Sequence, residues 1–282
     1  TVGPATLNVW TANNTYTTFE ALATYEKQIK NHTFKLLAGT SVEQSNNKGL
    51  EGYRNTFPNN YLYELGSGDK STATNDSSLE EYALLSFFGR INYAWKDRYL
   101  LEANLRYDGS SRFADGHRWG LFPSVSAGWR ISEEDFWKNA AVSAVVDNLK
   151  LRLSYGLAGA DNIDASLWRE TWKTGTTTYN GNVVSTYEPN GMKANPDLKW
   201  EKKEEFNVGL DFSVLKGRLI GTIDYYVRHT KDLLNSYTVP VPPNLYDTMF
   251  ANVGQINNSG IEISLGASPV VTKDFTWNLN LT

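Results

Sequence analysis

The most regular feature of the sequence is an alternation of apolar and polar residues with a period of two. From Tyr99 to Tyr107 the odd positions are Tyr, Leu, Ala, Leu and Tyr, whereas Glu102, Asn104 and Arg106 stand between them. Such alternation is typical of a β-strand with one apolar and one polar face. It recurs at 124–131, 149–156, 206–213, 219–228 and 261–267, and more weakly at 17–27, 33–43, 86–95 and 275–282. The sequence therefore predicts an all-β fold of about ten antiparallel strands.

Short and long connections join these predicted strands. The short turns are 30–31, 96–98, 216–217 and 272–274. The connection 132–147 is of moderate length, and we expect Ser132 to cap a short helix in it. The others are mostly long, polar and rich in Gly, Asn, Pro and Ser, and they cover 44–84, 109–117, 159–199 and 233–251. The short connections are therefore predicted at one end of the sheet and the long ones at the other.

Strand length and aromatic placement favour an antiparallel transmembrane β-barrel of the outer-membrane type. A strand of ~10 residues at ~3.3 Å per residue, tilted by ~45°, spans ~23 Å, close to the ~25 Å apolar band of such barrels. Aromatic residues lie beside the connections predicted at the short-turn end, at Tyr25, Phe34, Trp95, Tyr99, Phe136, Trp137, Phe275 and Trp277. Aromatic rings at the same level along the membrane normal are typical of the girdle at a membrane–water interface.

The polar faces of these strands are predicted to line a lumen. The candidate lumen-facing residues are Arg90, Glu102, Asn104, Arg106, Arg130, Arg152, Asp211, Asp224, Arg228 and Glu262. Their charges are nearly balanced, so we expect them to solvate the lumen and to pair with one another or with a plug. A lining without one dominant sign does not indicate ion selectivity and fits bulky neutral or mixed cargo.

A soluble β-sandwich is the alternative fold, because its strands also alternate. The many charges on the polar faces weigh against it, since a dry core between two sheets does not tolerate unpaired charges. A sandwich would bury the odd positions of 99–107, whereas a membrane barrel exposes them to lipid.

Composition excludes several classes of protein. The 282 residues carry a net charge of −4 with no run of Lys or Arg, which argues against nucleic-acid binding. No segment approaches the ~20 consecutive apolar residues of a membrane helix. There is no Cys, and 13% of the residues are aromatic in a chain of mean hydropathy −0.45. Many rings are therefore expected where an apolar surface meets water.

No catalytic or cofactor motif is present, so we expect neither an enzyme nor a cofactor. The sequence has no nucleophile elbow, no phosphate-binding loop and no H-E-x-x-H pair, and His32, His117 and His229 are far apart. The run from Asp161 to Asp164 offers closely spaced oxygen ligands, but it lacks the Gly and distal Glu of a calcium-binding EF-hand. We interpret it as a polar loop, with an adventitious calcium site as the alternative.

Three stretches resemble the barrel of the SusC/RagA-type TonB-linked (TonB-dependent) outer-membrane transporters of Bacteroidetes-like bacteria. They are Arg98–Phe113, Asn195–Glu201 (NPDLKWE) and Tyr225–Leu234, and Asn252–Glu262 fits the same pattern. The resemblance covers most of 80–282 in the right order. It implies a protein of the bacterial outer membrane, in contact with lipid, that imports large nutrients such as oligosaccharides or peptides. It also implies a SusD-like surface lipoprotein as partner and TonB as the source of energy.

The resemblance also implies a partial barrel. Transporters of this kind resemble barrels of about 22 strands with a plugged lumen, whereas this sequence predicts about ten. We therefore expect 1–282 to form part of a TonB-dependent receptor-like β-barrel domain, with the plug and the N-terminal, TonB-contacting parts outside this sequence. A small closed barrel of ten strands is the alternative.

Aromatic residues in the long connections are the candidate contacts for a ligand or partner, because exposed rings stack on sugar faces and anchor proteins. They are Tyr61, Tyr63, Trp168, Trp172, Tyr179, Tyr187 and Trp200. The alternative is that they pack the connections on themselves. A soluble or surface-attached β-sandwich that binds glycans through these rings is the competing function.

The predicted faces can be tested by paired substitutions. Leu105→Arg, on the face assigned to lipid, should block membrane assembly at a cost of ~2–4 kcal/mol near mid-bilayer, whereas Asn104→Arg should be tolerated. The measurement is the amount of full-length protein recovered in outer-membrane fractions. Equal effects of the two changes would favour the sandwich.

Overall fold

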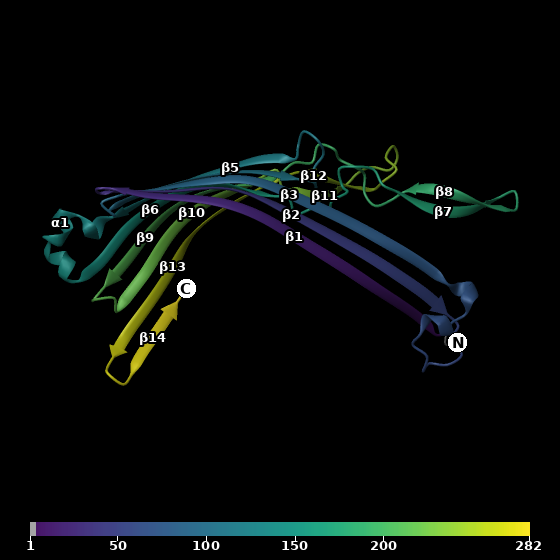
Figure 1. The fold of residues 1–282 in the computed structure, drawn as a ribbon, viewed down its shortest axis with the longest axis horizontal. Coiled ribbons are helices and arrows are strands. Elements are labelled where there is room, and N and C mark those ends of the chain that lie inside the picture. Colours follow the sequence, from purple (N-terminus) through teal and green to yellow (C-terminus); the bar gives the residue numbers. More distant parts are fainter. Residues whose placement is uncertain (1–3) are drawn as a thin grey trace. The chain divides into compact units, whose positions relative to one another are not determined.

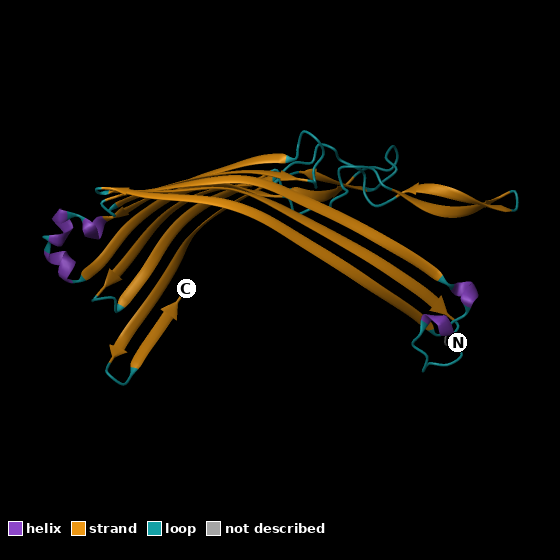
Figure 2. Cartoon of the chain, in the orientation of Figure 1, coloured by secondary structure: helices purple, strands orange, loops and turns teal. Residues whose placement is uncertain are grey.

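The computed structural model describes residues 4–282, which form a ten-stranded sheet and two separate two-stranded hairpins (Figures 1 and 2). The order in the large sheet is β1-β2-β3-β4-β5-β6-β9-β10-β13-β14. Its strands are β1 (Thr6–Ile29), β2 (His32–Asn55), β3 (Thr74–Trp95), β4 (Tyr99–Ser110), β5 (Trp119–Arg130), β6 (Val146–Ala160), β9 (Glu201–Val214), β10 (Leu219–Lys231), β13 (Gln255–Val271) and β14 (Thr276–Leu281). The hairpins pair β7 (Trp172–Tyr179) with β8 (Asn182–Pro189), and β11 (Leu234–Thr238) with β12 (Thr248–Asn252).

The chain divides into two compact units. The larger unit consists of Glu20–Thr40 and Ser86–Thr282, and it contains β4 to β14 with the adjoining parts of β1, β2 and β3. The smaller unit consists of the described residues up to Phe19 together with Ser41–Leu85, and it contains the remaining parts of the same three strands.

β1, β2 and β3, which run through both units, are longer than the sequence pattern predicts. β1 and β2 have 24 residues each and β3 has 22, about twice the ~9–11 that a membrane strand needs. The predicted connection 44–84 is wrong, because β2 runs to Asn55, β3 begins at Thr74, and only 56–73 connects them through the short turns η1 (Leu65–Ser67) and η2 (Lys70–Thr72). Residues 44–55 are almost entirely polar, so they carry no apolar alternation to reveal a strand.

In the larger unit, the alternation seen in the sequence separates two faces of one sheet. Leu101 and Leu105 of β4 are 47% and 51% exposed, whereas the polar residues between them are half-buried. The interstrand register extends this apolar face across the sheet through the pairs Leu101↔Ala127, Ala127↔Leu153, Leu153↔Val208, Val208↔Tyr225 and Tyr225↔Ile261. The odd positions are therefore not buried against a second layer, and the sandwich alternative is wrong.

The ends of the sheet order show that the ten strands do not close. β1 and β14 occupy the two ends, and they are not paired with each other within residues 4–282. The small closed barrel is therefore also wrong, and the partial barrel is confirmed. Among the described residues, no helix has the length and apolar character to cross a membrane.

The short turns lie where the sequence places them, but the connection between β5 and β6 differs in detail. It contains the 3₁₀ turns η3 (Ile131–Glu133) and η4 (Ala141–Ala144) and the short helix α1 (Asp135–Lys138). The expectation that Ser132 caps a helix is wrong, because Ser132 is buried inside η3 and its Oγ donates a hydrogen bond to Asn148 Oδ1 at 3.3 Å. Glu134 precedes α1, without a side-chain capping bond.

The β7–β8 hairpin lies inside the predicted connection 159–199, and the β11–β12 hairpin lies in 233–251 and ends one residue beyond it, at Asn252. Asn180 and Gly181 join β7 to β8, and both have positive φ, at 50° and 78°. Asn-Gly between two extended segments is a strong signal for a two-residue hairpin turn, so this hairpin was detectable from the sequence. Its strands carry Thr on both faces, so they lack a clear apolar side.

Candidate functional site

The ten candidate lumen residues all lie on the face opposite the apolar one. The register places Arg152, Gly209, Asp224 and Glu262 in one row across β6, β9, β10 and β13. Arg130 pairs with Lys150, Asp211 pairs with Thr222, and Arg228 pairs with Glu205 on the same side. We call this surface the polar face, and it is the surface that the sequence assigns to the lumen.

Arg152 is the centre of the polar face. Its Nε donates to Asp211 Oδ1 at 2.8 Å, and its Nη2 donates to Asp224 Oδ1 at 3.0 Å. To reach Asp224 on β10, the Arg152 side chain from β6 passes over Gly209 of the intervening strand β9. A Cβ at Gly209 would overlap the Asp224 carboxylate and lie 2.6 Å from Arg152 Nη2. The contact between three strands therefore depends on a glycine at this position.

The other charges of the polar face also form local pairs. Arg106 Nε donates to Asp108 at 2.8 Å, and its Nη2 donates to Ser86 Oγ at 3.0 Å. Arg90 Nε donates to Asn104 Oδ1 at 2.7 Å. Asn104 in turn donates to Glu102 at 2.8 Å.

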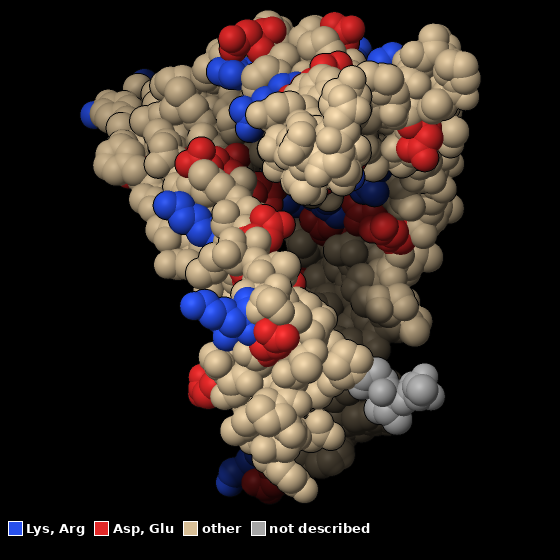
Figure 3. All heavy atoms as spheres, turned by 90° about the vertical axis from the view of Figure 1, so that its right-hand side faces the viewer, with Lys and Arg blue, Asp and Glu red and all other residues tan. Residues whose placement is uncertain are grey.

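At β9 and β10, the Arg228 guanidinium lies 2.7 Å from Glu205. Figure 3, which faces the right-hand side of Figure 1, shows Lys and Arg side chains beside Asp and Glu side chains, with no large block of either sign in that view. Partly exposed pairs of this kind contribute little to stability, about 0–1 kcal/mol each. Their main effect is to present a wet, nearly neutral surface.

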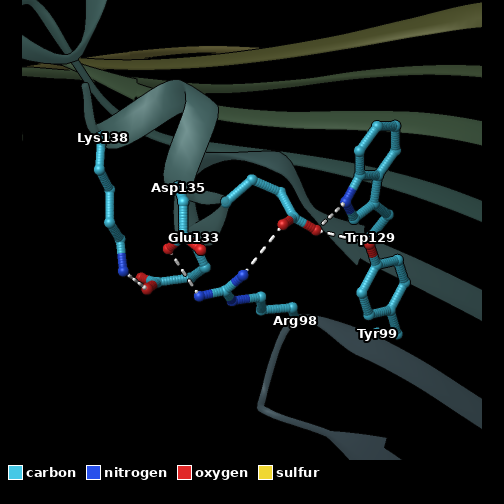
Figure 4. Close-up of polar contacts among 7 residues, drawn as sticks. Arg98, Tyr99, Trp129, Glu133, Asp135 and Lys138 are labelled. Atoms are coloured by element: carbon cyan, nitrogen blue, oxygen red, sulfur yellow. Dashed lines mark hydrogen bonds and ion pairs between the residues drawn. The ribbon is translucent and has the colours of Figure 1, made fainter. Parts of the chain in front are cut away.

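The short-turn end of the sheet carries a second polar cluster, centred on Glu134 (Figure 4). Glu134 Oε1 accepts hydrogen bonds from the Tyr99 hydroxyl at 2.6 Å and from Trp129 Nε1 at 3.1 Å, and Oε2 accepts one from Arg98 at 3.0 Å. Arg98 also pairs with Asp135 at 3.0 Å. Tyr99 and Trp129 are cross-strand partners on the apolar face. The cluster therefore attaches the connection around α1 to the aromatic girdle.

The ring contacts extend this girdle along neighbouring strands. Trp95 stacks on Tyr99 with 5.4 Å between ring centroids, and Tyr99 stacks on Trp129 at 6.4 Å. Phe34 lies 5.1 Å from Tyr93. Of the rings predicted beside the short turns, Phe34, Trp95 and Tyr99 thus pack against neighbouring rings.

At the opposite end, the NPDLKWE segment (195–201) holds the long connections together. The Asn195 amide donates to the Phe250 carbonyl at 2.8 Å, and the Asn195 backbone N–H donates to the Leu167 carbonyl at 2.9 Å. Asn252 Nδ2 donates to the Lys199 carbonyl at 2.7 Å, and Lys199 N–H donates back to Asn252 Oδ1 at 2.9 Å. We call this set of contacts the loop anchor. The sequence analysis identified Asn195–Glu201 and Asn252–Glu262 only by their resemblance to a transporter family. It did not predict that the two segments contact each other.

The loop anchor includes a correction for Trp200. The sequence predicts an exposed ring, but Trp200 is only 5% exposed, packs at 5.2 Å from the Phe122 ring and 5.5 Å from the Phe113 ring, and donates its indole N–H to the Arg118 carbonyl. A buried ring has no free face for stacking. Trp200 is thus part of the packing beneath the connections rather than a contact for cargo.

The other candidate aromatic residues differ in exposure. Trp168 is half-buried, and the Arg169 guanidinium lies 5.8 Å from its ring. Tyr61 and Tyr63, in the 56–73 connection of the smaller unit, are 85% and 76% exposed. Trp172, Tyr179 and Tyr187 are exposed on the β7–β8 hairpin. Trp172 and Tyr187 share one face of this hairpin, whereas Tyr179 lies on the other.

The candidate metal ligands have other partners. Asp161 accepts a hydrogen bond from Ser110 Oγ at 2.7 Å, and its carboxylate lies 3.7 Å from Arg112. A guanidinium at that distance competes with a cation for the carboxylate. His32 and His229 contact Tyr93 and Asn257, respectively. Within residues 4–282, no three His, Asp or Glu side chains gather as a group that could hold a metal ion.

Comparison with known proteins identifies the relatives of this chain. Residues 2–282 match the family model described as TonB dependent receptor-like, beta-barrel. The chain is 44% identical over 202 residues to the TonB-dependent receptor SusC of Bacteroides thetaiotaomicron, which covers 70% of this chain and 20% of SusC. It is 34% identical over 260 residues to the TonB-dependent receptor P26 of Formosa agariphila, which covers 91% of this chain and 26% of P26.

A solved structure has the same fold. The structure of the RagAB peptide importer in the closed-closed state matches with a TM-score of 0.87 and 26% identity, over 97% of this chain and 30% of the matched chain. The chain thus spans between a fifth and a third of the length of these relatives. Their names describe receptors and an importer rather than enzymes, in agreement with the expectation from the sequence.

The role of Gly209 can be tested by adding a side chain. Gly209→Ala should separate Arg152 from Asp224 and, since such partly exposed pairs contribute about 0–1 kcal/mol each, lower the stability of the full-length protein by about 1 kcal/mol. The measurement is the temperature at which the folded band disappears in semi-native gel electrophoresis. Gly89→Ala is the control, because its Cβ would meet the nearest atom at an ordinary 3.6 Å. An equal effect of both changes would contradict the role given to Gly209.

The Glu134 cluster predicts a pH dependence. The hydrogen bond from Tyr99 is the largest influence that holds the pKa of Glu134 below its ordinary value of 4.5, followed by Trp129, and the Arg98 charge acts in the same direction. A lowered pKa in the folded state means that the ionised carboxylate stabilises the protein above pH 4.5 and loses this effect as the pH falls through the lowered pKa.

Glu134→Gln should therefore lower the Tm of the full-length protein at pH 7, and the gap from the wild type should narrow below pH 4.5. The Tm is followed by tryptophan fluorescence in detergent. Glu188→Gln, at an exposed position on β8, is the control and should show little effect at any pH. A gap that stays constant from pH 7 to pH 3 would contradict the assignment.

Proposed function

Because this chain belongs to the family of TonB-dependent receptor-like β-barrels, we propose that it forms part of the wall of a transporter in the bacterial outer membrane that imports large nutrients. The observation that carries the proposal is the contrast between the two faces of one sheet. The apolar face forms a continuous row from β4 to β13 in which most side chains are exposed, whereas the polar face carries paired charges. Lipid fits the first surface, and a wet lumen fits the second.

The polar face suits passage of bulky solutes. Arg152 and Lys150 together balance the charges of Asp211 and Asp224, and Arg228 pairs with Glu205. A nearly neutral lining creates no strong electrostatic barrier and no tight site for one ion. Oligosaccharides and peptides are cargo of this description, and one similar structure is that of a peptide importer.

We propose the remaining parts of the cycle by analogy with the relatives. Cargo would be captured at the end of the long connections, where a SusD-like surface lipoprotein would also dock. TonB would supply energy through parts of the transporter other than residues 1–282, and cargo would then pass along the polar face.

The proposal predicts energy-dependent uptake. Cells that express the full-length protein should accumulate a radiolabelled casein digest or fluorescein-labelled maltooligosaccharides faster than a deletion strain. A protonophore should abolish the difference, because TonB draws on the inner-membrane proton gradient.

Cell fractionation is the accompanying control. The protein should appear in the outer-membrane fraction and should require detergent for extraction. Recovery in the soluble fraction, with equal uptake of both probes by the two strains, would instead support a glycan-binding module without a pore.

A further inference from the structure

The β7–β8 hairpin has two chemically different faces. Directly paired residues share a face in an antiparallel ladder, so the pairs Trp172↔Pro189 and Thr174↔Tyr187 belong to one side together with Thr176↔Ser185 and Thr178↔Val183. We call this side the ring face. It carries no charged residue. The other side carries Tyr179 and the ion pair between Lys173 and Glu188, which lie 3.5 Å apart.

The two rings of the ring face are close enough to act together. Trp172 is 53% exposed and Tyr187 is 71% exposed. They occupy diagonal positions on neighbouring strands, which places such residues about 7–8 Å apart, within reach of aromatic side chains. Both rings therefore offer free surface on the same side of the hairpin.

Hydroxyl groups continue the ring face toward the turn. Thr174, Thr176, Thr178 and Ser185 are all exposed, and each hydroxyl can both donate and accept hydrogen bonds. Rings beside neutral hydroxyls match the two kinds of surface of a sugar, whose CH groups pack on aromatic faces and whose hydroxyls form hydrogen bonds. A charged peptide or an anionic glycan would find no countercharge on this side.

The two legs of the hairpin are joined to each other at its base, and Lys193, just after β8, ties this stem to β12 because its N–H donates to the Thr248 carbonyl at 2.9 Å. Thr171 Oγ1 donates to the Asn190 carbonyl at 2.9 Å, and the Asn190 N–H donates to the Thr171 carbonyl at 2.9 Å. The loop anchor then holds Asn195 to Leu167, on the two sides of the hairpin in sequence. Figure 1 shows β7 and β8 beyond the ends of the neighbouring strands of this unit, on the side of the long connections. The ring face is therefore a supported surface rather than a free loop.

We propose that the ring face is a binding site for neutral oligosaccharides, in which Trp172 and Tyr187 stack on sugar rings and the neighbouring hydroxyls hold the sugar hydroxyls. This inference rests on the proposed transport function and specifies the class of its cargo. Tyr179 on the opposite face is not part of the site.

The test measures binding to the full-length protein in detergent by isothermal titration calorimetry. The probes are maltoheptaose, cellohexaose, xylohexaose and mannohexaose, with a casein digest as the peptide probe. At least one neutral oligosaccharide should bind the wild type, and Trp172→Ala or Tyr187→Ala should weaken that binding about tenfold or more. Tyr179→Ala, an equally exposed ring on the same hairpin, should leave it unchanged.

Several outcomes would overturn the inference. One is that the wild type binds none of the four oligosaccharides. Another is that Trp172→Ala and Tyr179→Ala reduce the affinity for the oligosaccharide equally. A third outcome is that Trp172→Ala binds sugars normally but the full-length variant no longer co-purifies with the SusD-like lipoprotein. That result would assign the ring face to a protein partner. Energy-dependent uptake of the casein digest, with no oligosaccharide binding, would refute the ring-face site and leave the transport function standing.

Discussion

The structure depends on one constraint, which is that the two faces of a single sheet meet different solvents. In hydrocarbon every backbone N–H and C=O must be paired within the protein, and a continuous ladder of antiparallel strands achieves this. The apolar row from Leu101 to Ile261 and the ion pairs of Arg152 are two consequences of the same constraint. The Glu134 cluster marks the boundary, because its carboxylate binds polar atoms of rings that lie on the apolar face.

The fold was predictable wherever the two solvents differ. Residues 101–107 alternate between apolar and polar, the pattern expected of a strand with lipid on one side and water on the other, and β4 follows that alternation. The pattern fails for 44–55 and for the β7–β8 hairpin, where polar residues occupy both sides and no apolar period remains. In the hairpin, Asn180-Gly181 still marked the turn. Turn chemistry thus remains informative where hydrophobic periodicity does not.

The sequence predicted which residues lie on the polar face, but it did not predict which of them contact one another. The alternation assigned Arg152, Asp211 and Asp224 to one side, yet their meeting over Gly209 depends on the register of three strands, which the sequence does not state. The prediction that the Trp200 ring is exposed was wrong for a related reason. Its neighbours in sequence are polar, whereas Phe113 and Phe122, which bury it, are far away along the chain. Long-range packing therefore decided which rings remained exposed.

The loop anchor fixes the backbone of the long connections but leaves most of their side chains unconstrained. Asn195 and Asn252 contact mainly backbone groups of the connections that they hold, so the anchor constrains the path of those connections more than their side chains. Substitutions of exposed residues on a hairpin held in this way need not reduce the stability of the sheet below it. The exposed side chains of the hairpin can therefore change while the wall keeps its structure, whereas Gly181 is required by the positive φ of the turn.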